Sequence, residues 1–265
     1  AIDQHYLAPF AYFAVPDGMD YADVPWRRGR GYDVEAMAGV LTADDVWVRR
    51  VIDETVRHVG DPNAVRALGF CVSVAHAEFM ARKFRDRGIR AEALSGQTGS
   101  DDRRAILDRF RAGDTTVVFA VDVLNEGVDL PLVDTILFLR PTDSATLFLQ
   151  QLGRGLRRAE GKDVCTVLDF VGNHRKEFRF DLRLRAILGG SRRDLERAIN
   201  DDFPFLPSGC SLQLEGVARD LILANIRNAL PSTWKARTDE LRRLGDVSLE
   251  TYLDETGLEL DDVYA

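Results

Sequence analysis

From residue 67 onward, short apolar runs rich in β-branched residues alternate with segments of helical periodicity. The runs are ALGFCVSV (67–74), a shorter one at 89–94, TTVVFAV (115–121), VDTILFL (133–139) and CTVLDFV (165–171). Strands this apolar are buried on both faces, and intervening helices of about 10–15 residues are the usual crossovers between parallel strands. The sequence therefore predicts an α/β fold with a parallel sheet flanked by helices.

The predicted helices have recognisable ends. Ser100 is expected to be the N-cap of one helix, with acidic residues in its first turn, and another helix is expected to begin near Ser144. Residues 1–60 carry weak strand signals and several breakers, with one helix expected from about Asp44 to His58. Beyond residue 172 the pattern becomes helical, which predicts a small helical extension at the C-terminal end.

The charge of the chain is unevenly distributed. The 265 residues contain 35 Lys and Arg against 43 Asp and Glu, for a formal charge of −8. Such a balance argues against binding nucleic acid through bulk positive charge. Residues 201–265, however, hold 13 acidic and 6 basic side chains, whereas residues 140–200 hold 13 basic and 8 acidic ones. The acidity belongs mostly to the C-terminal part, and a local nucleic-acid site is compatible with the rest.

Cysteine and histidine spacing predicts neither disulfides nor a metal site. The three cysteines are far apart and form no CxxC pair, and the four histidines are equally scattered. No apolar run approaches the roughly 18 residues that a membrane span needs, and the first residues lack the features of a signal peptide. We therefore expect a cytoplasmic protein with no membrane partner.

Polar or small residues follow three of the predicted strands. These segments are Ser73–His76, Leu94–Gly99 and Asp122–Asp129. In parallel sheets, ligands bind at the carboxyl ends of the strands, where loops and helix N-termini present backbone N–H groups. Each segment alone is equally well explained as an ordinary turn.

A fourth segment, 150–158, has a more specific pattern. Its sequence QQLGRGLRR places three arginines beside two glycines at the end of an apolar helix. Arg154 and Arg157 are three positions apart, so they would project from one side of that helix and match phosphate oxygens with their planar guanidinium groups. The alternative is a solvated basic face.

No nucleotide-binding P-loop is recognisable. Gly155 to Lys162 looks similar, but five residues instead of four separate its glycines, Asp163 follows the lysine, and the segment precedes a strand. No Asp-Glu-x-Asp or Asp-Glu-x-His box occurs either. The chain alone is therefore not expected to hold a Mg-nucleotide in the usual way.

Taken in order, these segments resemble the C-terminal RecA-like domain of superfamily 2 helicases, the DEAD/DEAH-like group. SVAHAEFMARKF resembles motif IV, FAVDVLNEGVDLP resembles motif V, and QQLGRGLRR fits the motif VI pattern QxxGRxxR. LSGQTGSDDRRAILDRFRAG is similar to the intervening stretch. LRPTDSATLFLQQLGRGLRR and FPFLPSGCSL also resemble bacterial helicases related to restriction-type enzymes.

The resemblance implies a division of the chain and of the chemistry. Residues 1–60 would be a linker or N-terminal segment from a first motor domain, residues 61–190 the RecA-like domain, and residues 191–265 a helical extension. An N-terminal RecA-like domain of the same polypeptide would hold most of the ATP and Mg. Arg154 and Arg157 would be catalytic arginine fingers on the γ-phosphoryl group.

Further roles follow from the same resemblance. Gln150 would orient motif VI, Asp129 would contact the ribose, and Gly127 would let the backbone approach the phosphates. Single-stranded or duplex nucleic acid, with DNA preferred and RNA possible, would lie across a second set of residues. That set is Ser73, His76, Ser95, Gly96, Gln97, Arg103, Asp122 and Asn125.

The sequence thus predicts one motor domain of an ATP-dependent helicase or translocase that is inactive without its partner domain. Two alternatives within this prediction stay open. Arg103 could form a helix-surface salt bridge with Asp101 or Asp102 instead of touching nucleic acid. The whole chain could also be a non-catalytic nucleic-acid-binding or scaffold module, in which the arginine pair grips nucleic-acid phosphates.

Overall fold

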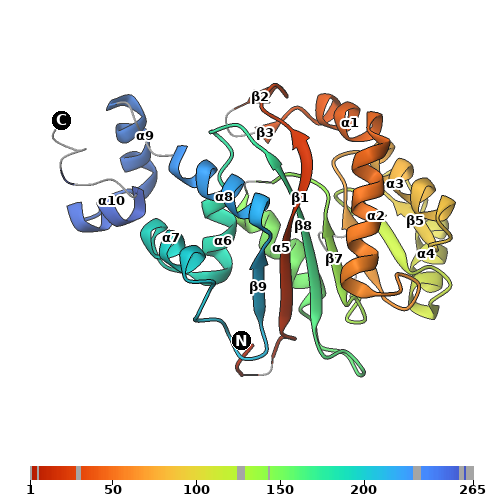
Figure 1. Cartoon of the computed structure of the whole chain (residues 1–265). Helices are drawn as coiled ribbons and strands as arrows, with labels where there is room; N and C mark the ends of the chain where they lie inside the picture. The colour runs from red at the N-terminus through yellow and green to blue at the C-terminus, as the bar shows by residue number, and fades with distance from the viewer. Residues whose placement is uncertain are drawn as a thin grey trace.

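The centre of the computed structural model is a seven-stranded sheet in the order β5-β6-β4-β7-β8-β1-β9, in which every neighbouring pair is parallel (Figure 1). The structure describes residues 2–4, 6–27, 31–123, 129–142, 144–228, 234–256 and 260. The strands are β1 (Phe10–Asp20), β4 (Ala67–Phe70), β5 (Ala91–Leu94), β6 (Val117–Ala120), β7 (Thr135–Phe138), β8 (Cys165–Asn173) and β9 (Ser211–Leu214). A separate antiparallel pair joins β2 (Trp26–Arg27) to β3 (Gly31–Tyr32). The predicted α/β fold is confirmed.

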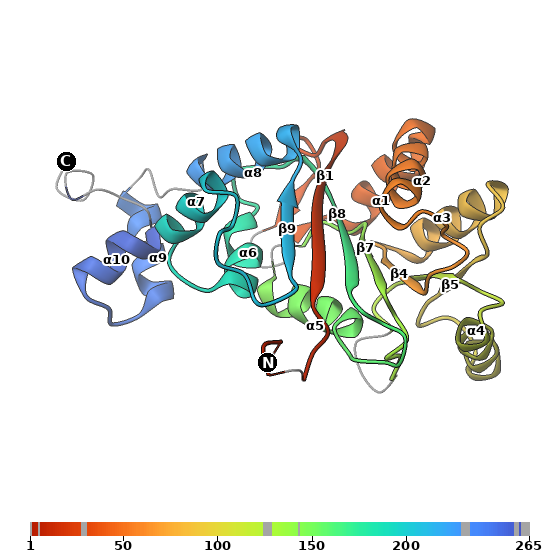
Figure 2. The same ribbon diagram turned by 60° about the horizontal axis from the view of Figure 1, so that its bottom comes forward.

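Helices cover both faces of the sheet and bury two apolar clusters (Figure 2). One cluster contains residues of α1 (Val34–Ala43), α2 (Asp45–Val59) and α3 (Val74–Asp86). The other contains residues of α4 (Ser100–Ala112), α5 (Ala145–Gly155), α6 (Phe180–Leu188), α7 (Arg192–Asn200) and α8 (Gly216–Asn228). The two remaining helices are α9 (Trp234–Leu244) and α10 (Leu249–Thr256). None of the described helices combines the length and apolarity needed to cross a bilayer.

Two helices, α2 and α5, have N-caps where the sequence predicts their starts, and α4 does not. Asp44 caps α2 by accepting from the N–H of Val46, and Ser144 caps α5 by accepting from the N–H of Leu147. Ser100 is not an N-cap, because α4 begins one residue earlier than expected, with Gly99 in the capping position and no side-chain cap bond. The carbonyl of Gly99 already accepts the first intrahelical bond, from Arg103, so the chain has turned into the helix before Ser100.

The first 60 residues contribute directly to the sheet. β1 pairs with β8 on one side and with β9 on the other, although Pro16 and Gly18 lie within it. The sequence indicated only weak strands here, because β1 obtains its second neighbour from a strand almost 200 positions away. The limits at 60/61 and 190/191 stay a prediction, and the structure adds that β1 and β9 share one sheet with β8.

A buried ionic group attaches α6 to the sheet. Asp169 of β8 accepts hydrogen bonds from the Tyr12 hydroxyl and from the guanidinium of Arg183, and all three side chains are buried. The Arg183 guanidinium also lies 4.7 Å from the ring centre of Phe148 on α5. Charges withdrawn from water are tolerated only when they are paired and hydrogen-bonded in this way. The contacts therefore fix α6 against both β8 and α5.

Candidate nucleotide and nucleic-acid sites

The predicted site residues form two groups at opposite edges of the sheet. Ser73, Ser95 and Asp122 follow β4, β5 and β6, so they lie at the carboxyl edge. The end of α5 lies at the amino edge, because the carbonyl of Leu156 accepts the N–H of Ala8, just before β1, at 2.7 Å. The residues that the resemblance assigns to nucleotide and to nucleic acid are therefore largely separate in space.

The two arginines at the amino edge lie on different kinds of backbone. Arg154 is in the last turn of α5, whereas Arg157 lies beyond the C-cap residue Leu156. The prediction that both project from one side of a single helix is therefore wrong. The helix ends where Gly155 packs against the sheet, since a Cβ there would lie 2.4 Å from Cys165 Sγ and 2.9 Å from Ile136. This glycine thus permits close helix–sheet packing and is not space left for an anion.

Arg157 and Asp129 form an ion pair between Nη1 and Oδ1. Both side chains are substantially exposed, at 46% and 67%. Burial, and after it the nearby positive charge of Arg157, lower the pKa of the Arg154 guanidinium. Two cations and one carboxylate are therefore gathered at this edge, and a bound anion would relieve the repulsion between the two guanidinium groups.

Lys162 holds the loops that carry these groups, and sequence reasoning did not predict this role. Its Nζ lies 2.6 Å from the carbonyl oxygen of Gly155, 2.7 Å from that of Arg157 and 3.3 Å from that of Pro131, and it also donates to the carbonyl of Val133. An ammonium group has three donors, so these acceptors share them. The end of α5 and the loop before β7 are thereby tied together.

At the carboxyl edge, two of the three predicted segments form tight turns. The Ser73 hydroxyl caps α3 by accepting from the N–H of His76 at 3.2 Å. The Ser95 hydroxyl accepts from the N–H of Gln97, and Gly96 and Gln97 are exposed. The hydrogen bonds within these segments fix their backbone at the carboxyl edge, and Gly96 and Gln97 leave part of it accessible.

Arg103 braces one of these turns from α4. Its guanidinium lies 3.4 Å from the carbonyl oxygen of Ser95 and 3.5 Å from that of Thr98. The alternative of a salt bridge with a neighbouring aspartate on α4 is therefore not what the structure has. Arg103 therefore supports the turn at Ser95–Thr98, and its own contact with nucleic acid stays a prediction.

His76 does not belong to the nucleic-acid set. Its side chain is fully buried, Nδ1 accepts from the N–H of Val72 at 3.4 Å, and the ring lies 5.5 Å from that of Trp47. Burial lowers its pKa to about 3, so the imidazole is neutral at pH 7. The prediction for His76 is corrected because a neutral, enclosed ring offers no surface to a phosphate.

Of the remaining predicted site residues, the structure describes Asp122 and Gln150. Asp122 has a positive φ of 50° and forms an ion pair with Arg140 at 2.8 Å. Gln150 is exposed on α5. Asn125 and Gly127 lie outside the described residues.

A cavity of about 240 Å³ opens beside Arg140 at the carboxyl edge. Trp26 and Tyr32, which pack edge to face with ring centres 4.8 Å apart, line one part of it. Ser144, at the N-terminus of α5, lines another part. Aromatic rings beside a guanidinium and a helix N-terminus are suited to a base and its phosphate. The sequence around Trp26 has no pattern that would predict its position beside Arg140 and Ser144 in this cavity.

A seven-stranded parallel sheet covered by helices on both faces is the architecture of a RecA-like α/β domain. Residues 50–159 match the family described as the helicase conserved C-terminal domain. This match agrees with the resemblance of the sequence motifs to helicase C-terminal domains.

Two curated relatives agree with this resemblance. The "Putative ATP-dependent helicase IRC3" of Saccharomyces cerevisiae is 30% identical over 172 residues, covering 64% of this chain and 24% of the yeast protein. The "Putative mitochondrial ATP-dependent helicase irc3" of Schizosaccharomyces pombe is 40% identical over 114 residues, covering 43% of this chain and 19% of that protein. The matched parts therefore span only about a quarter or less of these relatives.

One solved structure shares the fold over most of the chain. The ATP-dependent Type ISP restriction-modification enzyme LlaBIII bound to DNA matches 91% of this chain and 19% of its own, with a TM-score of 0.53 and 16% sequence identity. This likeness concerns the fold and extends beyond residues 50–159.

Proposed function

We propose that the chain acts as the second motor domain of an ATP-dependent nucleic-acid helicase or translocase. The observation that carries the proposal is the cationic end of α5, where Arg154 and Arg157 lie beside Asp129 in a segment that matches helicase C-terminal domains. An N-terminal RecA-like domain of the same polypeptide would supply the P-loop and the acidic residues for Mg. ATP with Mg supplies the transferable phosphoryl group and the free energy of hydrolysis.

In this proposal the residues of the amino edge serve the nucleotide. Arg154 and Arg157 stabilise negative charge that develops on the γ-phosphoryl group, a contribution of about 10³–10⁵ in rate in related systems. Asp129 binds the ribose and Gln150 orients the end of α5. Gly127 belongs to the same set by its place in the motif. The gathering of two guanidinium groups, with the pKa of Arg154 lowered, supports an anion at this edge.

Nucleic acid is proposed to cross the carboxyl edge, over the turns at Ser73, Ser95–Gln97 and Asp122. Backbone N–H groups and short side chains there would contact phosphates without reading base sequence. Asn125 is included by its place in the motif. DNA is the preferred substrate because residues 139–158 resemble restriction-type helicases, and RNA is the second choice. A cytoplasmic location belongs to the same proposal.

ATP hydrolysis by the chain and by its parent polypeptide tests this function. We expect residues 1–265 alone to show no appreciable turnover, and the parent, with its P-loop domain, to hydrolyse ATP. In the parent, Arg157→Ala should lower kcat by about 10³ or more while ATP affinity changes little. Arg158→Ala, one position outside the motif, is the matched control and should leave kcat within a few-fold.

Two outcomes would overturn the proposal. Robust turnover by residues 1–265 alone would mean that the nucleotide site is complete without a partner domain. A parent polypeptide that lacks a P-loop and hydrolyses no ATP, but still binds nucleic acid, would favour the non-catalytic binding module instead.

A further inference from the structure

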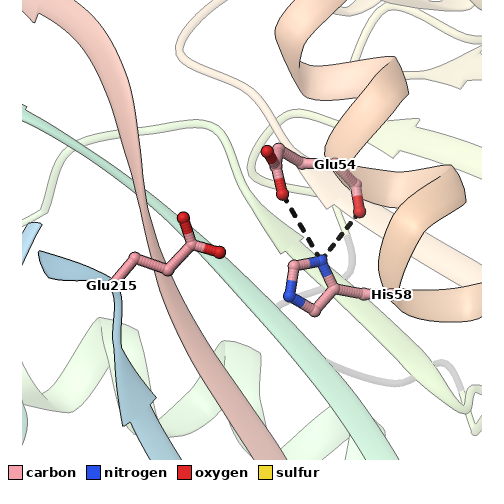
Figure 3. A group of neighbouring side chains, drawn as sticks. All are labelled: Glu54, His58 and Glu215. Atoms are coloured by element: carbon pink, nitrogen blue, oxygen red, sulfur yellow. Dashed lines mark hydrogen bonds and ion pairs between the residues drawn. The ribbon is translucent and has the colours of Figure 1, made fainter.

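Glu54, His58 and Glu215 bring metal-ligating atoms together beside β1 (Figure 3). Glu54 and His58 are one helical turn apart on α2, so they share a face. Glu215 is the residue between β9 and α8. One ligand atom from each side chain lies within 4.8 Å of the other two, although Glu215 is far away in the sequence.

β1 holds both sides of this cluster in place. The N–H of Glu215 donates to the carbonyl of Ala14 at 3.0 Å, which fixes the junction of β9 and α8 to the sheet. The ring of the adjacent Phe13 lies 4.3 Å from the imidazole of His58. The three ligands therefore stand on backbone that the core already orders.

The orientation of His58 suits metal binding. Nδ1 lies 2.9 Å from the carbonyl oxygen of Glu54 and 3.6 Å from Oε2 of the same residue. A carbonyl can only accept, so in the tautomer that makes this hydrogen bond Nδ1 carries the proton and Nε2 has the lone pair. Metal-binding histidines are commonly oriented by such a bond from the other ring nitrogen to a carbonyl or carboxylate.

The spacing requires only small side-chain movements. Ligand atoms at about 2.1 Å from one zinc ion are at most about 4.2 Å apart, and about 3.4 Å apart in a tetrahedral arrangement. The observed limit of 4.8 Å therefore closes by rotation of the two glutamates. The side chains of Glu54 and Glu215 are 19% and 25% exposed, which leaves them room to rotate and solvent access for an ion.

Arg57 already places a positive charge among these groups. Its Nη1 lies 3.0 Å from Glu54 Oε2 and 2.9 Å from Glu215 Oε1. With 60% of its side chain exposed, Arg57 can turn into solvent without disturbing the core. A guanidinium that bridges two carboxylates marks a position where a cation is favoured, and it would compete with a metal ion for the same oxygens.

We propose that Glu54, His58 and Glu215 form a binding site for a divalent transition metal of the zinc class, with water completing the coordination. An imidazole nitrogen with two carboxylates favours zinc over magnesium or calcium, which prefer oxygen ligands alone. The ion clips α2 to the junction of β9 and α8, and so joins the N-terminal part of the chain to its C-terminal extension. Histidine and cysteine spacing alone did not predict this site, because its third ligand comes from a distant segment.

Zinc titration of residues 1–265 tests the site. The titration uses protein without a histidine tag and with the substitution Cys210→Ser, which removes the one cysteine that is not buried. Calorimetry with ZnCl₂ should show one equivalent bound, and zinc should raise the melting temperature because it binds the folded state. MgCl₂ at the same concentrations should do neither.

Substitutions locate the ion. His58→Gln and Glu215→Gln should each lower zinc affinity at least about tenfold, since loss of even an outer partner has that effect. Glu78→Gln, the same change at an exposed position of α3, should leave affinity unchanged. Arg57→Ala should raise affinity by removing the competing cation.

Absence of zinc binding to the Cys210→Ser protein with its three ligands intact overturns the proposal, and so does binding that both ligand variants retain. Equal binding of magnesium would overturn the zinc-class assignment. Where His58→Gln does not yield folded protein, Glu215→Gln at the turn and the Arg57→Ala comparison decide the question.

Discussion

Arg157 donates to the carboxylate of Asp129, a residue 28 positions earlier that lies on the loop before β7. The resemblance assigns one of these residues to the γ-phosphoryl group and the other to the ribose, and here they hold each other. A guanidinium has five N–H donors, so Arg157 can keep this ion pair and still direct other N–H groups to a phosphate. The ion pair therefore places the two residues assigned to the nucleotide side by side.

Asp129→Asn in the parent polypeptide should therefore weaken ATP binding more than it slows catalysis. We expect KM for ATP to rise by about tenfold, equivalent to about 1.4 kcal/mol, with kcat within about twofold. Steady-state ATPase kinetics measure both constants. A fall in kcat with KM unchanged would contradict the ribose role of Asp129.

Lys162→Met should destabilise the chain and misplace Arg157. The substitution keeps the aliphatic stem but leaves carbonyls of Gly155 and Arg157 without their donor, at a cost of about 1–3 kcal/mol. Urea denaturation should show this loss, and kcat of the parent should fall with it. Lys176→Met, at an exposed position, should change neither quantity, and equal behaviour of the two variants would refute the positioning role.

Arg183→Met should be among the most destabilising single changes in the chain. It leaves the buried carboxylate of Asp169 with Tyr12 as a hydrogen-bond donor but without its cation, and breaking buried pairs of this kind costs about 3–5 kcal/mol. Adding Asp169→Asn should restore much of the loss in urea denaturation. Arg197→Met, at a pair whose arginine side chain is 71% exposed, should cost less than about 1 kcal/mol.

Buried His76 should make the chain less stable in acid. Its pKa is about 3 in the folded state because of burial, whereas the unfolded value is about 6.5. Below pH 6.5 the unfolded chain therefore takes up a proton that folded His76 does not, and stability falls as pH decreases. At pH 5 this difference amounts to about 2 kcal/mol.

Comparing the stability of the chain with that of His76→Gln at pH 7.5 and pH 5 separates the contribution of His76 from that of Asp17. Burial raises the pKa of Asp17 to about 6, so its contribution runs the other way: between about pH 4 and 6 the folded chain binds the extra proton, and stability falls as pH rises. His76→Gln, whose amide oxygen can still accept from Val72, should reduce the loss of stability between pH 7.5 and pH 5. An unchanged loss would mean that His76 contributes nothing to it.

Arg140→Ala should weaken binding of single-stranded DNA and reduce its salt dependence. Removing one phosphate contact should change the slope of log K against log salt by about 0.7, measured by fluorescence anisotropy with labelled oligothymidine. Trp26→Ala should lower affinity without changing the slope, since stacking is not ionic. Arg111→Ala, at the far end of α4, is the control. Unaltered binding by Arg140→Ala would remove the cavity beside β2 from the nucleic-acid path.

The strands and helices between residues 67 and 171 were predictable because their apolar periodicity is strong and local. β1 and β9 were not, since the first contains Pro16 and Gly18 and the second, with the sequence SLQL, alternates polar and apolar residues and has no continuous apolar run. Each becomes a strand through its neighbours in the sheet, which the local pattern does not encode.

The candidate site residues were also predictable from local sequence only in part. Motif spacing led to Arg154 and Arg157, but the helix end at Gly155 depends on packing against β7 and β8. The role of Lys162 depends on carbonyl positions from two loops, and the enclosure of His76 depends on Trp47 from α2. Residue type indicated the chemistry, whereas tertiary contacts decided which side chains reach the surface.

α5 begins at Ala145, after its N-cap Ser144 on the carboxyl edge, and ends at Gly155 on the amino edge. Its 11 residues span about 16 Å, and its buried face is wedged between the sheet and Arg183 of α6. One continuous helix, contacted near its middle by Arg183, therefore joins the residues at the carboxyl edge to those at the amino edge. A movement of one end of α5 would be transmitted along the helix to the other end, and the contact with α6 would limit how far α5 moves.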